Sequence, residues 1–215
     1  MIDLKRYTKA EMSAILHTNS KQGITRKLDR YGITYISEGR GDRLFITVTA
    51  IQNPFKVFCI TELGFPAQCD FYKLRNFMFY FFADNDTFRS MPDEVMETLL
   101  NERGKRVSRQ TIAGWKRRLD RLGIIQLNQW DYVYYFAFKN HQRMCDHEEY
   151  AKAWKEYWEN KRAGMSTYTA IEYMRFNYGG VARKQPRAYL NPFYTDTIRV
   201  LQDLIYVNIE EELGD

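Results

Sequence analysis

Residues 18–33 read Thr18-Asn-Ser-Lys-Gln-Gly-Ile-Thr-Arg-Lys-Leu-Asp-Arg-Tyr-Gly-Ile33, and residues 109–124 read Arg109-Gln-Thr-Ile-Ala-Gly-Trp-Lys-Arg-Arg-Leu-Asp-Arg-Leu-Gly-Ile124. The two stretches align without gaps and are identical at seven of sixteen positions. In each, apolar residues recur at helical spacing among basic ones, and a Gly-Ile pair precedes an apolar, strand-like segment. We therefore expect two related units, each with a basic helix that leads into a strand.

Positive charge is concentrated in the part of the chain that contains this repeat. The whole chain has a net charge of +5 and a pI near 9.0. Residues 1–140 contain 22 Lys and Arg against 15 Asp and Glu, which is +7, whereas residues 141–215 contain 10 against 12, which is −2. This distribution is typical of a protein whose first part neutralises phosphates and whose tail has another role.

The predicted first unit covers residues 1–50. Thr8 and Glu11 have the spacing of a capping box, so we expect a helix from there to about His17. Residues 18–20 supply a turn and the cap of the repeat helix, whose inward face should be Ile24, Leu28 and Tyr31. Residues 33–48 then read as two strands joined by a glycine-rich turn that carries Arg40 and Arg43.

Residues 51–70 read as a structured connector, in which residues 55–60 are compatible with a strand. The predicted second unit, residues 71–140, begins with an aromatic helix over 71–83, which we interpret as a core helix, and a polar loop over 84–87. A further helix should begin at Ser90 and end at Gly104.

Ser108 should cap the second repeat helix, with Ile112, Trp115, Leu119 and Leu122 on its inward face. Strands over residues 124–127 and 132–138 should then form a second hairpin around residues 128–131. This turn has Trp130 where the first has arginines, so we expect Trp130 to be structural or to contact protein.

Residues 141–215 are predicted to be a helical C-terminal region. Helices are expected over residues 147–163, 167–178 and 195–213, with a basic, proline-containing loop over 181–192. The last helix is apolar on more than one side, which favours a homodimer through the C-terminal helices. The alternative is that it folds back onto its own chain.

Both units resemble winged helix-turn-helix domains, in which a Leu-x-x-x-Gly-Ile ending of the recognition helix leads into the wing. The resemblance covers about residues 7–50 and 71–138, and two such units in one chain also resemble plasmid-type replication initiators and regulators of phages or mobile elements. The sequence departs from the winged-helix pattern in the first unit, which leaves little room for a helix before Thr8. The resemblance implies an α+β, helix-rich fold in which the repeat helix of each unit lies in the major groove and the hairpin tip lies beside it.

The outward residues of both repeat helices, with the two arginines of the first wing, have the chemistry of DNA contacts. Arg, Lys, Gln and Asn recognise base edges, and hydroxyl groups and the remaining basic residues hold phosphates. The predicted DNA-binding residues are Ser20, Lys21, Gln22, Thr25, Arg26, Arg40, Arg43, Ser108, Arg109, Gln110, Lys116 and Arg117.

Other functions have weaker support in the sequence. His141, Cys145 and His147 lie close together but match no common zinc spacing, so we expect no metal site and no cofactor. No P-loop, Gly-x-Ser-x-Gly or His-x-His motif occurs, which argues against an enzyme. A winged-helix module that docks an acidic protein remains an alternative, and a nucleic-acid-processing enzyme is the third.

The sequence also indicates a cytoplasmic protein. Its first residues lack the apolar core of a secretory leader, and no apolar run approaches the length of a membrane span. Three cysteines without CxxC spacing favour a reducing compartment. We therefore expect a cytoplasmic, non-enzymatic protein that binds specific sequences of double-stranded DNA, as a transcriptional regulator or replication initiator of a phage, plasmid or other mobile element.

Overall fold

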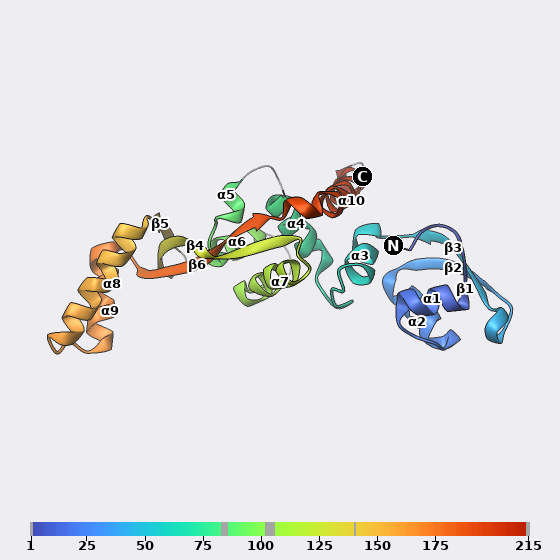
Figure 1. Ribbon diagram of the computed structural model, residues 1–215, viewed down its shortest axis with the longest axis horizontal. Coiled ribbons are helices and arrows are strands. Elements are labelled where there is room, and N and C mark those ends of the chain that lie inside the picture. The colour runs from blue at the N-terminus through green and yellow to red at the C-terminus, as the bar shows by residue number, and fades with distance from the viewer. Residues whose placement is uncertain (1, 83–85, 102–105, 140, 214–215) are drawn as a thin grey trace. The chain divides into compact units, whose positions relative to one another are not determined.

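The computed structural model describes residues 2–82, 86–101, 106–139 and 141–213, and over these it has the predicted helix-rich α+β fold (Figure 1). The chain divides into two compact units. The first is Met1–Arg75 together with Asp196–Asp215, and the second is Asn76–Thr195. The C-terminal residues thus belong with the N-terminal unit, which the sequence did not indicate.

The N-terminal part of the first unit, up to residue 51, is built on a three-stranded antiparallel sheet and two helices. Its elements in chain order are β1 (Arg6–Thr8), α1 (Lys9–Leu16), α2 (Lys21–Tyr31), β2 (Ile33–Glu38) and β3 (Phe45–Ile51). The sheet order is β1-β3-β2, so the last strand is central. Met12 of α1, Leu28 of α2 and Ile46 of β3 are fully buried in one core. The predicted helix, turn, helix and hairpin are all confirmed, whereas the short strand β1 was not predicted.

Local signals set the ends of these helices as expected. The backbone N–H of Thr8 donates to Glu11 Oε2 at 2.7 Å, and the Glu11 N–H donates to Thr8 Oγ1 at 3.2 Å, which completes the capping box. At the end of α2, Gly32 has φ of 76°, a left-handed conformation that favours glycine. Ile33 follows directly as a buried residue of β2.

The connector contains a helix, so the possible strand over residues 55–60 is wrong. Helix α3 spans Pro54–Thr61, and the Asn53 side chain accepts a hydrogen bond from the Lys56 N–H at 2.7 Å. Asn followed by Pro is a helix N-cap followed by the residue best suited to the first helical position. Because Phe55, Phe58 and Cys59 are buried, the short apolar run is a buried helix.

The first helices of the second unit are α4 (Phe71–Phe82), whose first five residues belong to the first unit, α5 (Asp86–Arg89), α6 (Asp93–Leu100) and α7 (Arg109–Arg121). The ring of Phe77 packs against Trp115 and Phe88, with centroids 5.5 and 6.3 Å apart, which confirms α4 as a core helix. Helix α6 begins after Pro92, so the predicted start at Ser90 is too early. The expected helix end at Gly104 and residues 84–85 of the expected loop lie outside the described residues, and the rest of that loop begins α5.

The second predicted hairpin is wrong, because β4 (Ile125–Phe138) is one long strand. It pairs with β5 (His141–Cys145) on one edge and with β6 (Val181–Leu190) on the other. The pairing with β6 continues on both sides of a bulge between Asn128 and Tyr132. The polar residues that suggested a turn therefore form the bulge, and the segment predicted as a basic loop is a strand.

The predicted C-terminal helices are confirmed as α8 (His147–Arg162), α9 (Thr167–Tyr178) and α10 (Thr195–Leu213). Helices α8 and α9 lie side by side and pack on the sheet around Phe136 (Figure 1). Helix α10 buries Ile198, Leu201 and Ile205 within the single chain, as the fold-back alternative requires. The homodimer stays a prediction. Within the described ranges, no helix has the length and apolar character needed to cross a membrane.

Two glycines, one within α7 and one just after it, should respond oppositely to alanine. Gly123→Ala should destabilise the protein by about 1–2 kcal/mol, because φ is +75° and a Cβ atom would lie 3.0 Å from the Tyr194 ring. Gly114→Ala should instead stabilise it by about 0.5–1 kcal/mol, because the added methyl group meets nothing within 4 Å and alanine favours the helix. Urea unfolding of both variants measures this, and shifts in the same direction would contradict it.

Candidate nucleic-acid interface

Helix α2 presents the predicted polar face to solvent. Ser20 Oγ accepts a hydrogen bond from the Gly23 N–H at 2.9 Å and begins the helix. The helix turns Ile24, Leu28 and Tyr31 into the core, and it leaves Lys21, Gln22 and Arg26 exposed, with Thr25 half-buried between them. The predicted outward placement is therefore confirmed for Lys21, Gln22 and Arg26, whereas Thr25 lies at the edge of the inward face. Contact of these residues with DNA stays a prediction.

The turn between α1 and α2 is four residues long, His17–Ser20, and it packs closely against the start of α2. A Cβ atom on Gly23 would lie 2.2 Å from Thr18 Oγ1, so the Thr18 side chain would have to move to admit any larger residue. His17 ends α1 in a left-handed conformation with φ of 48°. A helix, a short turn and a second helix joined in this way have the form of a helix-turn-helix.

The β2–β3 loop carries two exposed arginines, as predicted. Arg40 and Arg43 lie at either end of this loop's tight turn, in which the Arg43 N–H donates to the Arg40 carbonyl at 3.1 Å. Asp42, between them, accepts a hydrogen bond from Lys9 Nζ at 3.2 Å, which connects the loop to the start of α1. The loop and the polar face of α2 thus belong to one folded unit.

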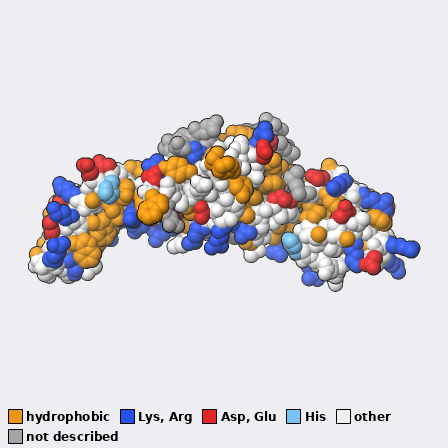
Figure 2. Space-filling model, viewed as in Figure 1, with side chains coloured by type: hydrophobic (Ala, Val, Ile, Leu, Met, Phe, Trp, Pro, Cys, Tyr) orange, Lys and Arg blue, Asp and Glu red, His pale blue; other side chains and the backbone are white. Residues whose placement is uncertain are grey.

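In the second unit, helix α7 keeps part of the predicted face. The Ser108 side chain caps the helix by accepting the Thr111 N–H at 3.3 Å, and Gln110 and Arg117 are exposed. Arg117 occupies the repeat position of Arg26, so the outward arginine is common to both copies. Figure 2 shows Lys and Arg side chains gathered over α7.

Lys116 is not on the outward face, which corrects the prediction. It is 5% exposed, and its Nζ donates to Asp93 Oδ1 of α6 at 2.6 Å. Its repeat partner Thr25 is half-buried, so this position lies at the edge of the inward face, where a long lysine stem packs along apolar surface. Lys116 therefore joins α7 to α6 and is removed from the predicted DNA-binding residues.

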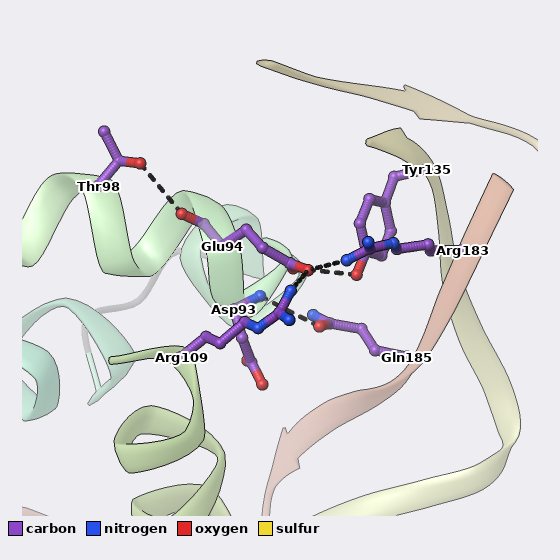
Figure 3. A network of polar contacts seen from close by, with 7 residues as sticks. All are labelled: Asp93, Glu94, Thr98, Arg109, Tyr135, Arg183 and Gln185. Carbon is purple, nitrogen blue, oxygen red and sulfur yellow. Dashed lines mark hydrogen bonds and ion pairs between the residues drawn. The ribbon is translucent and has the colours of Figure 1, made fainter. Parts of the chain in front are cut away.

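Glu94 of α6 binds residues from three other elements (Figure 3). Its Oε1 accepts hydrogen bonds from Arg109 of α7 at 2.9 Å and from Arg183 of β6 at 2.6 Å. Its Oε2 accepts one from the Tyr135 hydroxyl of β4 at 3.0 Å. Arg109, one of the predicted DNA-binding residues, is therefore the first residue of α7 and forms an ion pair with Glu94.

The Glu94 carboxyl is held in its ionised form. Burial alone raises its pKa, but hydrogen bonds from its own backbone N–H, Tyr135 and Arg109, together with the charge of Arg183, outweigh burial and lower the pKa. Burial and the nearby Glu94 charge raise the pKa of Tyr135, so its hydroxyl keeps the proton that it donates. The cluster is therefore one carboxylate under two guanidinium groups at neutral pH.

Sequence reasoning missed Glu94, Tyr135 and Arg183. Glu94 was readable only as an acidic residue in the first turn of a helix, and Tyr135 and Arg183 meet it because strands far apart in the sequence pair. No local spacing indicates this contact. Trp130, expected to be structural or a protein contact, lies in the β4 bulge with 93% of its surface exposed, so it does not support the core.

Comparison of the chain with protein-family models, with curated proteins and with solved structures gives no match. Among the described residues, no group of three or more His, Cys, Asp and Glu side chains is arranged to hold a metal ion.

Lys116 and its neighbour Arg117 should differ sharply in their effect on stability. Lys116→Ala should lower the free energy of unfolding by roughly 1.5–3 kcal/mol, because it removes a charged hydrogen bond and leaves Asp93 without this partner. Arg117→Ala, on the exposed face, should change it by less than about 0.5 kcal/mol. Denaturant unfolding of the two variants measures the difference, and equal effects would mean that Lys116 is a surface residue.

Proposed function

We propose that the protein binds double-stranded DNA, with α2 of the first unit in the major groove. The observation that carries this proposal is a helix, a four-residue turn and a second helix with Gln22 and Arg26 exposed, followed by a hairpin whose loop exposes Arg40 and Arg43. This order, with β1 as an additional strand, is similar to that of a winged helix-turn-helix. It supports the family resemblance seen in the sequence.

The exposed residues have distinct roles in this proposal. The major groove admits one helix, in which glutamine recognises adenine and arginine recognises guanine through paired hydrogen bonds. Gln22 and Arg26, one turn apart on α2, are the proposed readers. Lys21, Ser20 and Thr25 are proposed to hold phosphates, and Arg40 and Arg43 to reach the backbone beside the groove.

Helix α7 is proposed to make a second DNA contact through Gln110 and Arg117, with Ser108 at its start. The proposed role is that of a cytoplasmic, non-enzymatic regulator or replication initiator of a phage, plasmid or other mobile element. The support for this role is that one basic chain contains two proposed reading helices, because two such helices can recognise a longer DNA site than one helix can.

A protein-interaction surface is the second candidate function, and a different observation favours it. Helices α8 and α9 expose Trp158, Tyr168 and Phe176 at 53%, 74% and 89%, and Figure 2 shows hydrophobic side chains gathered over this hairpin. Large exposed aromatic side chains are enriched in protein contacts. The proposed homodimer through the C-terminal helices would use this surface together with any exposed part of α10.

The proposed readers should determine sequence preference. Sites selected from random DNA give the preferred sequence, and Gln22→Ala or Arg26→Ala should then weaken its binding by about 1–3 kcal/mol and relax preference at one base pair. Lys21→Ala is the matched control, because removing a side chain that holds a phosphate weakens all sequences alike. An unchanged selected sequence for the Gln22→Ala, Arg26→Ala double variant would remove α2 as the reader.

The salt dependence of binding tests both the general proposal and the role of the wing. A protein that neutralises phosphates loses affinity steeply as salt rises, whereas a module for an acidic protein partner shows no such DNA binding. Replacing Arg40 and Arg43 by Ala should make the slope of log K against log salt shallower by up to about two, one for each phosphate that the protein no longer neutralises. An unchanged slope would mean that the loop does not touch DNA.

A further inference from the structure

Arg109 and Arg183 converge on a single oxygen atom. Arg109 is the first residue of α7, and Arg183 lies on β6, yet both donate from Nη1 to Glu94 Oε1, at 2.9 and 2.6 Å (Figure 3). The two guanidinium groups are therefore spaced so that one anionic oxygen can bind both. A non-bridging phosphate oxygen has the same charge and accepts the same hydrogen bonds.

Solvent reaches the arginines much more than the carboxylate. The side chains of Arg109 and Arg183 are 47% and 42% exposed, whereas that of Glu94 is 15% exposed. A guanidinium has five N–H donors, and the bonds to Glu94 use one nitrogen of each. Each pair joins a half-exposed arginine to a mostly buried carboxylate, so an anion from solvent can reach the arginines and compete with Oε1 for them.

We propose that Arg109 and Arg183 form a binding site for a backbone phosphate of DNA, and that Glu94 occupies this site in the free protein. The site rests on the proposed DNA binding and adds to it a strand, β6, that the sequence assigned to a loop of the C-terminal region. When a phosphate replaces Oε1, the carboxylate keeps the hydrogen bond that its Oε2 accepts from Tyr135. The Glu94 carboxylate therefore keeps one hydrogen bond after the exchange.

The surroundings of the cluster fit a phosphate that approaches along α7. The hollow beside Glu94 is lined by Arg106, Lys139 and Gln142 as well as Arg109. Ser108 and Gln110 flank Arg109, and both are exposed. A backbone phosphate at this point would fix the start of α7 against the duplex, as phosphate contacts fix the register of reading helices.

Glu94→Gln tests the competition. The variant keeps the size of the side chain but weakens its hold on both arginines, so DNA affinity at fixed salt should rise about two- to fivefold. Glu97→Gln is the matched control for lost negative charge, because Glu97 lies on the same helix and lines the same hollow. It should raise affinity less. In an Arg109→Ala, Arg183→Ala background the gain from Glu94→Gln should disappear.

Arg183→Ala tests the site without changing Glu94. It should weaken binding to all DNA sequences and make the salt slope shallower by about one. Arg187→Ala on the same strand is the control, because Arg187 bonds to Ser90 and Asp131 and lies outside the proposed site. It should leave the slope unchanged. Circular dichroism of each variant checks that the fold is retained.

The outcomes separate this site from the proposed function. Salt-dependent DNA binding by the wild-type chain, with equal effects of Glu94→Gln and Glu97→Gln and an unchanged slope in Arg183→Ala, overturns the site and leaves DNA binding by α2 in place. A gain that persists without the two arginines also overturns it. Absence of any DNA binding by the wild-type chain overturns the proposed function and this site with it.

Discussion

The antiparallel pairing of β4 with β6 determines how the second unit is built. The two strands pair from Ile125 with Leu190 to Ala137 with Val181, across a bulge that absorbs residues 129–131. Because β6 provides partners on both sides of the bulge, β4 continues through a polar segment that would otherwise reverse as a turn. The same pairing puts Arg183 and Gln185 beside α6, where they bond to Glu94 and to the backbone of Asp93. Helix α6 in turn bonds to α7 through Asp93 and Lys116, so the position of α7 depends on a strand that follows it by about sixty residues.

Most of what the sequence predicted correctly is controlled by neighbours in the chain. Helix starts at Thr8, Ser20 and Ser108, and helix ends at Gly32 and Gly179, follow from side-chain caps and left-handed glycines within a few residues. The predictions are wrong where a distant segment of the chain, or a second local signal, determines the structure. Residues 128–131 have turn composition but lie opposite β6, residues 55–60 have strand composition but follow an Asn-Pro helix start, and the burial of Lys116 requires Asp93 of α6. The outward face of α2 was predictable because Ile24, Leu28 and Tyr31 alone fix the rotation of that helix.

The repeat shows how one local pattern acquires two tertiary roles. Gly23 and Gly114 occupy equivalent positions, yet the first is needed because the α1–α2 turn packs against it, and the second faces nothing within 4 Å. Thr25 and Lys116 are also equivalent, and only the second reaches a carboxylate on a neighbouring helix. The positions that keep both identity and environment are the buried Leu28 and Leu119, the exposed pairs Arg26 with Arg117 and Arg30 with Arg121, and the terminal Gly-Ile pairs.

A count of basic residues does not measure how strongly each unit attracts DNA. In the second unit Arg109 and Arg183 bond to Glu94, Lys116 bonds to Asp93, and Arg187 lies 3.2 Å from Asp131, so much of its positive charge is already balanced inside the protein. An arginine that is already paired inside the protein must break that pair before it can bind a phosphate. It therefore contributes to DNA binding only the difference in free energy between the two ion pairs. In the proposed complex, binding through the exposed face of α2 and the β2–β3 loop does not require comparable ion pairs to break first. We therefore expect the first unit to supply most of the DNA affinity in the proposed complex. The second unit should add a contact whose strength depends on how easily the ion pairs of Glu94 with its two arginines break.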